Sequence, residues 1–265
     1  MSFEGKVVII TGSSSGLGQD CALNFASKGA KVTIHGQNPG RIAETLELLK
    51  SKGISADNLH VVQGPLEKEE VVQALVSETV QKFGRIDVIV NNAGCYEKSG
   101  ETDPESMATY DFVMDVNLRS PILLVKLAVP HLEKTKGSVI NISSMLGQMA
   151  IYIGAYYSIS KAAIDMFTKT SAIRLAPKGI RVNSIDAGHI DTPFLGPNRT
   201  TAPLCFLEAY KKDLNDRTAL QRAASPREIN ALVEFLASDK ASFITGSIVV
   251  ADGGFLAGVL PPKSN

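Results

Sequence analysis

The stretch that decides the fold is Lys6-Val-Val-Ile-Ile-Thr11-Gly12-Ser-Ser-Ser-Gly16-Leu-Gly18. Its first half is a continuous apolar run, which is typical of a strand buried on both faces. Residues 19–28 then carry apolar side chains at helical spacing until Gly29 ends the pattern. A strand, a glycine-rich loop and a helix in this order set backbone N–H groups and a positive helix end against a phosphate. Taken alone, the loop fits an ordinary strand-to-helix turn equally well.

The alternation of strand and helix continues along the chain. Further strands are predicted at 31–35, 59–63, 85–90, 137–142, 180–185 and 247–251. Helical spacing is found at 41–52, 67–83, 103–133, 161–175 and 225–237, with an interruption expected near Ser120-Pro121. Such alternation forms right-handed βαβ units. The sequence therefore predicts an α/β fold: a single Rossmann-like, doubly wound, seven-stranded parallel sheet with helices on both faces.

Length and composition are consistent with one domain. The chain has 265 residues and contains no linker, repeat or low-complexity tract. The segment 191–224 is rich in Pro, Thr and Asn and follows the sixth predicted strand. Open α/β sheets bind ligands outside the carboxyl ends of their strands. We therefore expect this segment to form a lid or substrate loop.

Charge and cysteine content argue against several classes of partner. Lys plus Arg number 27 and Asp plus Glu number 27, so net charge favours neither a nucleic acid nor an acidic membrane. The three cysteines are scattered without CxxC spacing, so neither a disulfide framework nor a metal site is predicted. The apolar run 121–130 is too short to span a bilayer, and no apolar signal-peptide region opens the chain. These features predict a cytoplasmic protein.

A serine, a tyrosine and a lysine form the candidate reaction centre. Ser144 follows a predicted strand, whereas Tyr157 and Lys161 are four residues apart and share one face of the next helix. An ammonium beside a phenol is expected to lower the phenol's pKa from ~10, which would let Tyr157 exchange a proton with a substrate oxygen. Ser144 would hydrogen-bond the same oxygen. Ser143 could be the working hydroxyl in place of Ser144. Tyr157 and Lys161 could instead be an exposed side-chain pair without a catalytic role.

The order and spacing of several motifs resemble those of the short-chain dehydrogenase/reductase family. The motifs are Gly12-x-x-x-Gly16-x-Gly18, Asn91-Asn-Ala-Gly94, Ser144, Tyr157-x-x-x-Lys161, Phe243-Ile-Thr-Gly246 and Asp252-Gly-Gly254. The resemblance covers the chain from Lys6 to Gly254. It implies an NAD(P)-dependent oxidoreductase, such as a carbonyl reductase, that interconverts a carbonyl compound and its alcohol by hydride transfer. It also implies that residues 1–265 form one dinucleotide-binding and catalytic domain.

The resemblance assigns roles to individual residues. Tyr157 would be the general acid in reduction and the base in oxidation, Lys161 would hold the nicotinamide ribose, and Ser144 would bind the substrate oxygen. Asn117 would hold a water linked to Lys161; its alternative role is to stabilise a helix bend. Asn91 and Asn92 have the alternative of bracing the central strands. The implied cofactor-binding residues are Gly12, Ser14, Ser15, Gly16, Leu17, Gly18, Gln37, Asn91, Ala93, Gly94, Tyr157, Lys161, Gly188, Ile190 and Thr192.

Three positions depart from the family pattern. The acid that usually ends the second strand and binds the ribose of NAD is Gly36 here. A site without that carboxylate would not repel a 2′-phosphate, so NADP is favoured over NAD. The arginine common in NADP-using members is replaced by Gln37, which leaves Ser13, Ser14, Gln37 or Arg41 as candidates. Gly64 replaces an aspartate after the third strand, and Ala187 replaces a proline after the sixth.

The sequence also leads to expectations about the substrate, the oligomeric state and an alternative function. Apolar residues near the predicted centre favour an apolar ketone, aldehyde or secondary alcohol, although core or subunit packing is an alternative role for each. These residues are Met145, Leu146, Met149, Ile151, Tyr152 and Phe194. The resemblance implies a homotetramer or homodimer that uses the helices after the fourth and fifth strands. Because of the three departures, a non-catalytic nucleotide-binding sensor or interaction protein on the same fold is the alternative function.

Overall fold

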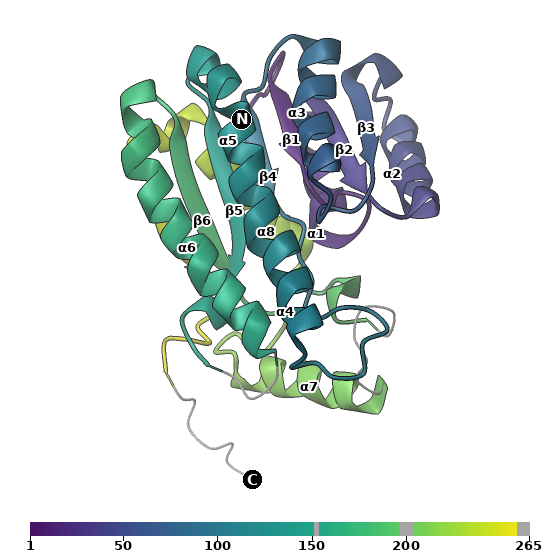
Figure 1. The fold of residues 1–265 in the computed structure, drawn as a ribbon, viewed down its shortest axis with the longest axis vertical. Coiled ribbons are helices and arrows are strands. Elements are labelled where there is room, and N and C mark those ends of the chain that lie inside the picture. The colour runs from purple at the N-terminus through teal and green to yellow at the C-terminus, as the bar shows by residue number, and fades with distance from the viewer. Residues whose placement is uncertain (151–153, 197–203, 259–265) are drawn as a thin grey trace.

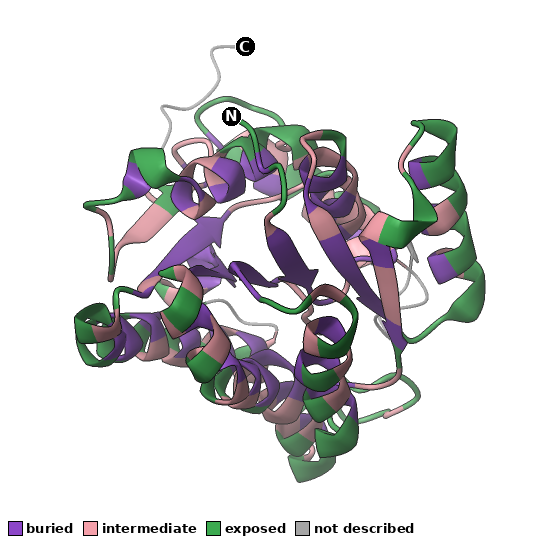
Figure 2. Ribbon diagram, turned by 90° about the horizontal axis from the view of Figure 1, so that it is seen from above, coloured by how far each residue is buried: buried purple, intermediate pink, exposed green. Residues whose placement is uncertain are grey.

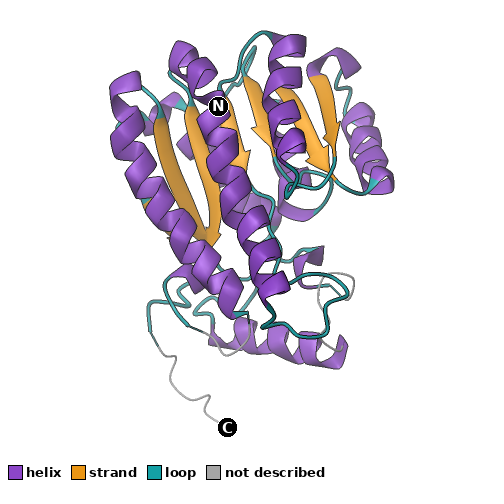
Figure 3. Cartoon of the chain, in the orientation of Figure 1, coloured by secondary structure: helices purple, strands orange, loops and turns teal. Residues whose placement is uncertain are grey.

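The computed structural model describes residues 1–150, 154–196 and 204–258, and a parallel sheet of seven strands forms its centre (Figure 3). The strand order is β3-β2-β1-β4-β5-β6-β7. The strands are β1 (Val7–Ile10), β2 (Lys31–Gly36), β3 (Leu59–Gln63), β4 (Val88–Asn91), β5 (Ser138–Ser144), β6 (Arg181–Ala187) and β7 (Ile248–Ala251). The order reverses between β1 and β4, which makes the sheet doubly wound. The predicted fold class is confirmed.

Helices cover both faces of the sheet (Figure 1). One layer contains α1 (Gly16–Ser27), α2 (Pro39–Ser51) and α8 (Pro226–Ala237), and the other contains α3 (Glu69–Phe83), α5 (Ser120–Thr135) and α6 (Ala155–Leu175). The helix α4 (Met107–Met114) leads into α5, whereas α7 (Leu204–Arg217) lies beyond the ends of the strands. Within the described ranges, no helix combines the length and the apolar composition that crossing a bilayer requires.

The core is built by alternation along each strand. Val8 and Ile10 of β1 pack with α1 and α8, whereas Ile9 between them packs with α3 and α5. Successive strand residues point to opposite faces, so a strand covered on both faces must be apolar throughout. Figure 2 shows the central strands buried between the two helical layers. The apolar run that opens the chain is therefore explained by its position in the middle of the sheet.

Two predicted elements differ from the structure. The helix expected from residue 103 begins at Met107, where Ser106 caps it by accepting a hydrogen bond from the Thr109 N–H at 3.2 Å. The expected interruption before α5 is a π-helical turn, Asp115–Arg119. The segment 191–224 was expected as a loop, but it contains the 14-residue helix α7. The surrounding Pro, Thr and Asn residues obscured a helix that exposes most of its side chains and so lacks a strong apolar period.

We expect the buried face of α3 to carry much of the stability of its layer. Leu75→Ala removes a fully buried side chain and should lower the free energy of unfolding by about 2–5 kcal/mol, as deletion of core leucines does. Leu48→Ala on α2, where the side chain is 42% exposed, is the matched control and should cost under about 1 kcal/mol. Urea denaturation followed by circular dichroism measures both. Equal losses in the two variants would contradict this account of the core.

Candidate functional site

A cavity of about 410 Å³ lies at the carboxyl ends of the central strands. The glycine loop after β1 and the residues after β2 line one part of it. The end of β5, the first turns of α6 and two residues of α7 line another part. The cavity therefore crosses the point between β1 and β4 where the strand order reverses, which is where doubly wound sheets bind their ligands.

The glycine loop has the geometry that a phosphate site requires. Gly12 and Gly16 have φ values of +65° and +56°, in the left-handed region that favours glycine. A Cβ on Gly18 would lie 2.5 Å from the Gly12 carbonyl oxygen, so the helix could not pack this closely with any larger residue. Helix α1 begins at Gly16, and the N–H groups of a first helical turn have no acceptor within the helix. The loop and helix end together suit an anion.

His35 connects this loop to the segment after β3. Its Nδ1 accepts a hydrogen bond from the Gly12 N–H at 3.0 Å, and its Nε2 lies 3.0 Å from the Gly64 carbonyl oxygen. Burial lowers the pKa of His35 to about 4, so the ring is neutral at neutral pH, with Nε2 as the donor. The unusual Gly64 thus takes part in holding the glycine loop through His35.

The end of β2 shows how the missing acid is accommodated. A Cβ on Gly36 would lie 2.5 Å from the Ser14 hydroxyl oxygen, so Ser14 occupies the space that a side chain at position 36 would need. Ser14, Gln37 and Arg41 line the cavity here, and Arg41 forms no ion pair with any residue that the structure describes. Ser13 is excluded as a cavity residue, because its hydroxyl donates to the Ile10 carbonyl at 2.8 Å.

The structure brings together the three residues of the candidate reaction centre. Ser144 ends β5, and Tyr157 and Lys161 lie in the first two turns of α6; all three line the cavity. Ser144 hydrogen-bonds Tyr157. The Lys161 Nζ lies 5.3 Å from the centre of the Tyr157 ring and donates to the Ile142 carbonyl at 2.8 Å. A hydroxyl, a phenol and an ammonium therefore face one space.

The predicted lowering of the pKa of Tyr157 was wrong. Burial raises the pKa of Tyr157 above its ordinary value, and the hydrogen bond with Ser144 only partly opposes this rise. Burial also lowers the pKa of Lys161 to about 8. Tyr157 therefore carries its proton at neutral pH. The sequence argument considered the charge of the neighbouring lysine but could not show how deeply the phenol is buried.

The asparagines predicted for the site have mainly structural contacts. The Asn117 side chain accepts from the Cys95 N–H at 2.9 Å and donates to the Ser160 hydroxyl at 3.0 Å. It lies in the π-helical turn and does not line the cavity, which favours the alternative of a stabilised helix bend. Asn91 also lies outside the cavity lining, because its amide donates to Asn141 across β4 and β5 at 2.8 Å. Asn92 braces the glycine loop by donating to the Thr11 carbonyl.

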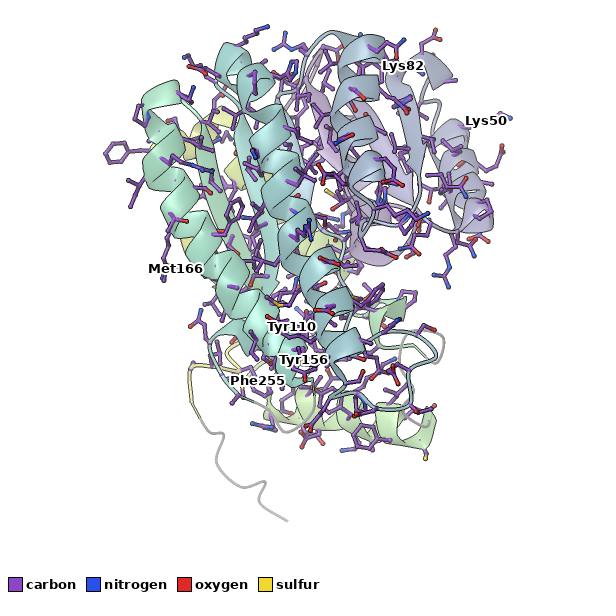
Figure 4. The ribbon with its side chains drawn as sticks, in the orientation of Figure 1. Lys50, Lys82, Tyr110, Tyr156, Met166 and Phe255 are labelled. Carbon is purple, nitrogen blue, oxygen red and sulfur yellow. The ribbon has the colours of Figure 1, made fainter. Side chains whose placement is uncertain are left out.

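The remaining predicted cofactor residues all line the cavity. They are Gly12, Ser14, Ser15, Gly16, Leu17, Gly18, Gln37, Ala93, Gly94, Gly188, Ile190 and Thr192, together with Tyr157 and Lys161. Ser143, the alternative hydroxyl, donates to the Lys161 carbonyl oxygen at 3.2 Å and so is engaged within the fold. Tyr156 points elsewhere, since its hydroxyl donates to the Glu105 carbonyl and its ring packs on Tyr110 (Figure 4).

Aromatic residues that the sequence argument missed cover the reaction centre. The Tyr96 ring stacks on the Tyr157 ring at 4.3 Å between centres, and Tyr96 hydrogen-bonds Tyr210 of α7. Its position two residues after Asn91-Asn-Ala-Gly94 was the available signal; Tyr210 lay in the segment expected as a loop. Met145, Leu146 and Phe194 line the cavity as predicted, and Met149 packs beside them. Ile151 and Tyr152 lie outside the described residues.

Comparisons with known proteins agree with this geometry. A family model described as enoyl-(acyl carrier protein) reductase matches residues 12–256. An uncharacterized oxidoreductase of Thermotoga maritima is 38% identical, with 97% of this chain and all of that protein covered. Glucose 1-dehydrogenase 2 of Bacillus subtilis is 36% identical, with 94% of each chain covered. A short-chain dehydrogenase/reductase of unknown function from Caenorhabditis elegans, crystallised with cofactor, has a TM-score of 0.89 at 35% identity, with 97% of each chain covered.

The matches extend over almost the whole chain. Sequence identities of 35% and 38% indicate membership of the same family and not only a shared fold. They include dehydrogenases and oxidoreductases by name, and the fold, the glycine loop and the Ser144–Tyr157–Lys161 arrangement fit them. The chain is an oxidoreductase and belongs to the short-chain dehydrogenase/reductase family, whose members use a nicotinamide dinucleotide.

Proposed function

We propose that this protein uses NAD(P) to interconvert an apolar ketone or aldehyde and its alcohol by hydride transfer. One observation carries the proposal: Ser144, Tyr157 and Lys161 face the cavity that also holds the glycine loop. A binding module would need the loop but not the three polar side chains.

A bound nicotinamide dinucleotide would supply or accept the hydride. The residues present fit it: the loop at Gly12 and Gly16 leaves room for backbone N–H groups to approach a pyrophosphate, and Gly188, Ile190 and Thr192 also line the cavity. Tyr157, protonated at neutral pH, would donate its proton to the substrate oxygen during reduction. Ser144 would hold that oxygen by a hydrogen bond, and the Lys161 ammonium would stabilise the phenolate left on Tyr157.

The walls around Tyr157 support an apolar substrate. Met145, Leu146, Leu214 and Phe255 are buried around the Tyr157 ring, and Tyr96, Phe194 and Tyr210 pack against them. Unpaired hydroxyl groups of a polyol would lose hydrogen bonds with water on entering such a site. A hydrophobic carbonyl compound or secondary alcohol is therefore a better fit than a sugar such as the one in the name of the Bacillus subtilis relative.

Substitution of the phenol tests the catalytic assignment. Tyr157→Phe removes the transferable proton but keeps the ring, so turnover of an apolar ketone panel with NADPH should fall by about 10²–10⁴-fold. Binding of NADPH, measured by fluorescence titration, should change little. Tyr156→Phe is the matched control, because that hydroxyl bonds the Glu105 carbonyl outside the cavity. Retained turnover in Tyr157→Phe would contradict the mechanism, and cofactor binding without any turnover by the native protein would favour the sensor alternative.

We propose that NADP is preferred to NAD because of the region around Arg41. Arg41 has no described ion-pair partner, and Ser14, Gln37 and Asn38 beside it carry no negative charge. A 2′-phosphate here would gain a charge-assisted hydrogen bond. Arg41 could therefore bind the 2′-phosphate even though the arginine usual in NADP-using members of the family is replaced by Gln37.

Arg41→Ala should therefore weaken NADPH binding selectively. A charge-assisted hydrogen bond contributes about 1.5–3 kcal/mol, so the Kd for NADPH should rise by at least about tenfold. The Kd for NADH should remain within about twofold of that of the native protein, since NADH lacks the 2′-phosphate. Parallel fluorescence titrations measure both constants. An equal rise for the two cofactors, or none, would exclude Arg41 as the determinant.

The contact between Gly36 and Ser14 gives a second test of cofactor binding. Gly36→Ala would place a Cβ 2.5 Å from the Ser14 hydroxyl and 2.7 Å from its Cβ, so Ser14, which lines the cavity, must move. Binding of both NADPH and NADH should weaken. Ser14→Gly combined with Gly36→Ala removes the clash and should recover most of the loss, with Ser14→Gly alone as control. Failure of the double variant to recover would show that position 36 acts in another way.

We propose further that residues 1–265 form a single catalytic domain in which the segment 191–224, including α7, encloses the substrate. A cytoplasmic location remains a prediction from the sequence.

We also propose a homotetramer or homodimer. Ile159, Met166 and Ile173 are seven residues apart on α6 and are 50%, 58% and 79% exposed, which forms an apolar stripe on one helix face. Figure 4 shows Met166 pointing away from the body of the protein.

Charge placed on this stripe should dissociate the assembly. Met166→Glu combined with Ile173→Glu would bury carboxylates in a subunit contact, which is costly without a partner charge. Light scattering after size exclusion should give a multiple of the 28.3 kDa chain mass for the native protein and a smaller multiple for the variant. Leu48→Glu, at an apolar side chain 42% exposed on α2 in the other helical layer, is the control. A native protein that already elutes as a monomer would refute the proposed assembly.

A further inference from the structure

Two buried carboxyl groups lie behind the reaction centre and have no part in the mechanism above. Asp165 is on α6 one turn after Lys161, and Asp186 is on β6 beside Ser143 of β5. Asp165 is 8% exposed and Asp186 is fully buried. Aspartate is almost never this buried without a partner, so the contacts of the pair require an explanation.

The hydrogen bonds around the two carboxyl groups imply a shared proton. Ser184 donates to Asp165 Oδ1 at 3.0 Å, and Gln148 donates to Asp186 Oδ2 at 2.6 Å. The other oxygen of Asp186, Oδ1, is buried, and no group in the described ranges donates to it. The two acids converge on one place, because Ser184 and Asp186 share one face of β6 and Asp165 Oδ2 lies 3.0 Å from the position that a Cβ on Gly147, next to Gln148, would take. Two carboxyl groups that share a site this deeply buried cannot both ionise easily, so the arrangement indicates a pair with one proton and one negative charge.

The pKa shifts of Asp165 and Asp186 agree with a pair that shares one proton. Burial raises the pKa of Asp186 to about 7, with the neighbouring Asp165 adding to the rise and Gln148 opposing it. Burial also raises the pKa of Asp165. Like charges that share a buried site cannot both ionise easily, so the pair keeps one proton near neutral pH.

Lys161 needs a negative charge of this kind. It is buried, and its ammonium forms a hydrogen bond with the Ile142 carbonyl but no ion pair with any described residue. Besides Asp165 and Asp186, the titratable groups that face it are Tyr157 on its own helix and Cys95 after β4. Both are neutral near pH 7, since burial raises the pKa of Tyr157 above its ordinary value and that of Cys95 to about 12.

We propose that Asp165 and Asp186 are positioning residues that share one proton, and that their remaining negative charge keeps Lys161 protonated beside Tyr157. The charge relationship stands whether or not the protein is an enzyme. Its consequence for proton transfer rests on the proposed function. The opposite charges are one helical turn apart, which leaves the ammonium free to face the cavity while its counter-charge stays behind it.

The titration of Lys161 can be measured without any substrate. Trace acetylation of the full-length protein with acetic anhydride at pH values from about 6 to 11, followed by peptide mass spectrometry, gives the reactivity of each lysine against pH. Lys161 lines the cavity but is only 4% exposed, so it should react more slowly than a surface lysine, and the pH dependence of its rate is what is compared. Lys50, 77% exposed on its side chain, is the internal reference. We expect the native midpoint for Lys161 at about 8.

Comparing a variant that lacks one acid with a variant that lacks both separates the effect of the negative charge on Lys161 from the effect of altered packing. In Asp186→Asn, Asp165 keeps one negative charge, so the Lys161 midpoint should move by less than about half a pH unit. In the double variant Asp165→Asn with Asp186→Asn, that charge is lost and the midpoint should fall by at least about one unit. Asp57→Asn, at an exposed acid, is the matched control. An unchanged Lys161 midpoint in a folded double variant would overturn the proposal, whatever the turnover of that variant.

A measurement on the native chain covers the case in which the double variant does not fold. Infrared difference spectra between the native protein and Asp186→Asn at neutral pH should show the C=O stretch of a protonated carboxyl group only in the native protein. Absence of that band would also overturn the proposal, because the pair would then carry no shared proton. Tyr157→Phe should leave both the band and the Lys161 midpoint in place even if turnover is lost, which separates this inference from the proposed function.

Discussion

The hydrogen bond from the Lys161 ammonium to the Ile142 carbonyl oxygen, 2.8 Å long, is the contact on which the site depends. It fixes the start of α6 against the end of β5, and thereby places Tyr157 beside Ser144. Taking a charged amine out of water is costly unless hydrogen bonds and an opposite charge surround it. The polar residues at the ends of β5 and β6 therefore follow from the burial of this single side chain.

The same edge of the sheet also explains how the departures from the family pattern are accommodated. Without an acid at Gly36, the space at the end of β2 is filled by the Ser14 hydroxyl of the glycine loop. Without an aspartate at Gly64, the backbone carbonyl of that residue bonds His35, whose other nitrogen holds Gly12. The loop is thus supported from β2 and β3 by contacts within the protein, and the changes alter the part of the cavity beside β2 more than the part beside Tyr157.

Much of the fold could be predicted because short stretches of sequence determine its strands and turns. Each buried strand is a short apolar run, and each glycine-rich or proline-containing turn marks a boundary, so the strand ranges were correct to within a few residues. The helix α7 was missed because its apolar residues show only a weak helical period and its neighbours are turn formers. Its contribution to the cavity through Tyr210 and Leu214 was missed for the same reason.

The candidate site was predictable in its members but not in its electrostatics. Spacing was enough to bring Ser144, Tyr157 and Lys161 together, because a four-residue interval on a helix fixes a common face. Spacing could not show that Asn117 is committed to Cys95 and Ser160, since those contacts depend on a π-helical turn. Nor could it show that Tyr157 is buried under Tyr96, which reverses the expected direction of its pKa shift.

The cost of this arrangement favours a catalyst over a sensor. A buried ammonium and a buried carboxylate each lose several kcal/mol of hydration, and hydrophobic residues of the same size often leave a protein that is equally stable or more stable. A module that only binds a nucleotide gains nothing from that cost, because the glycine loop and the residues after β2 belong to other elements than the buried acids and Lys161. A proton-transfer site does gain, because a phenolate formed on Tyr157 needs a fixed positive charge nearby, and Lys161 can supply it only if its own charge is balanced. The counter-charge behind Lys161 is thus better explained by chemistry at Tyr157 than by binding alone.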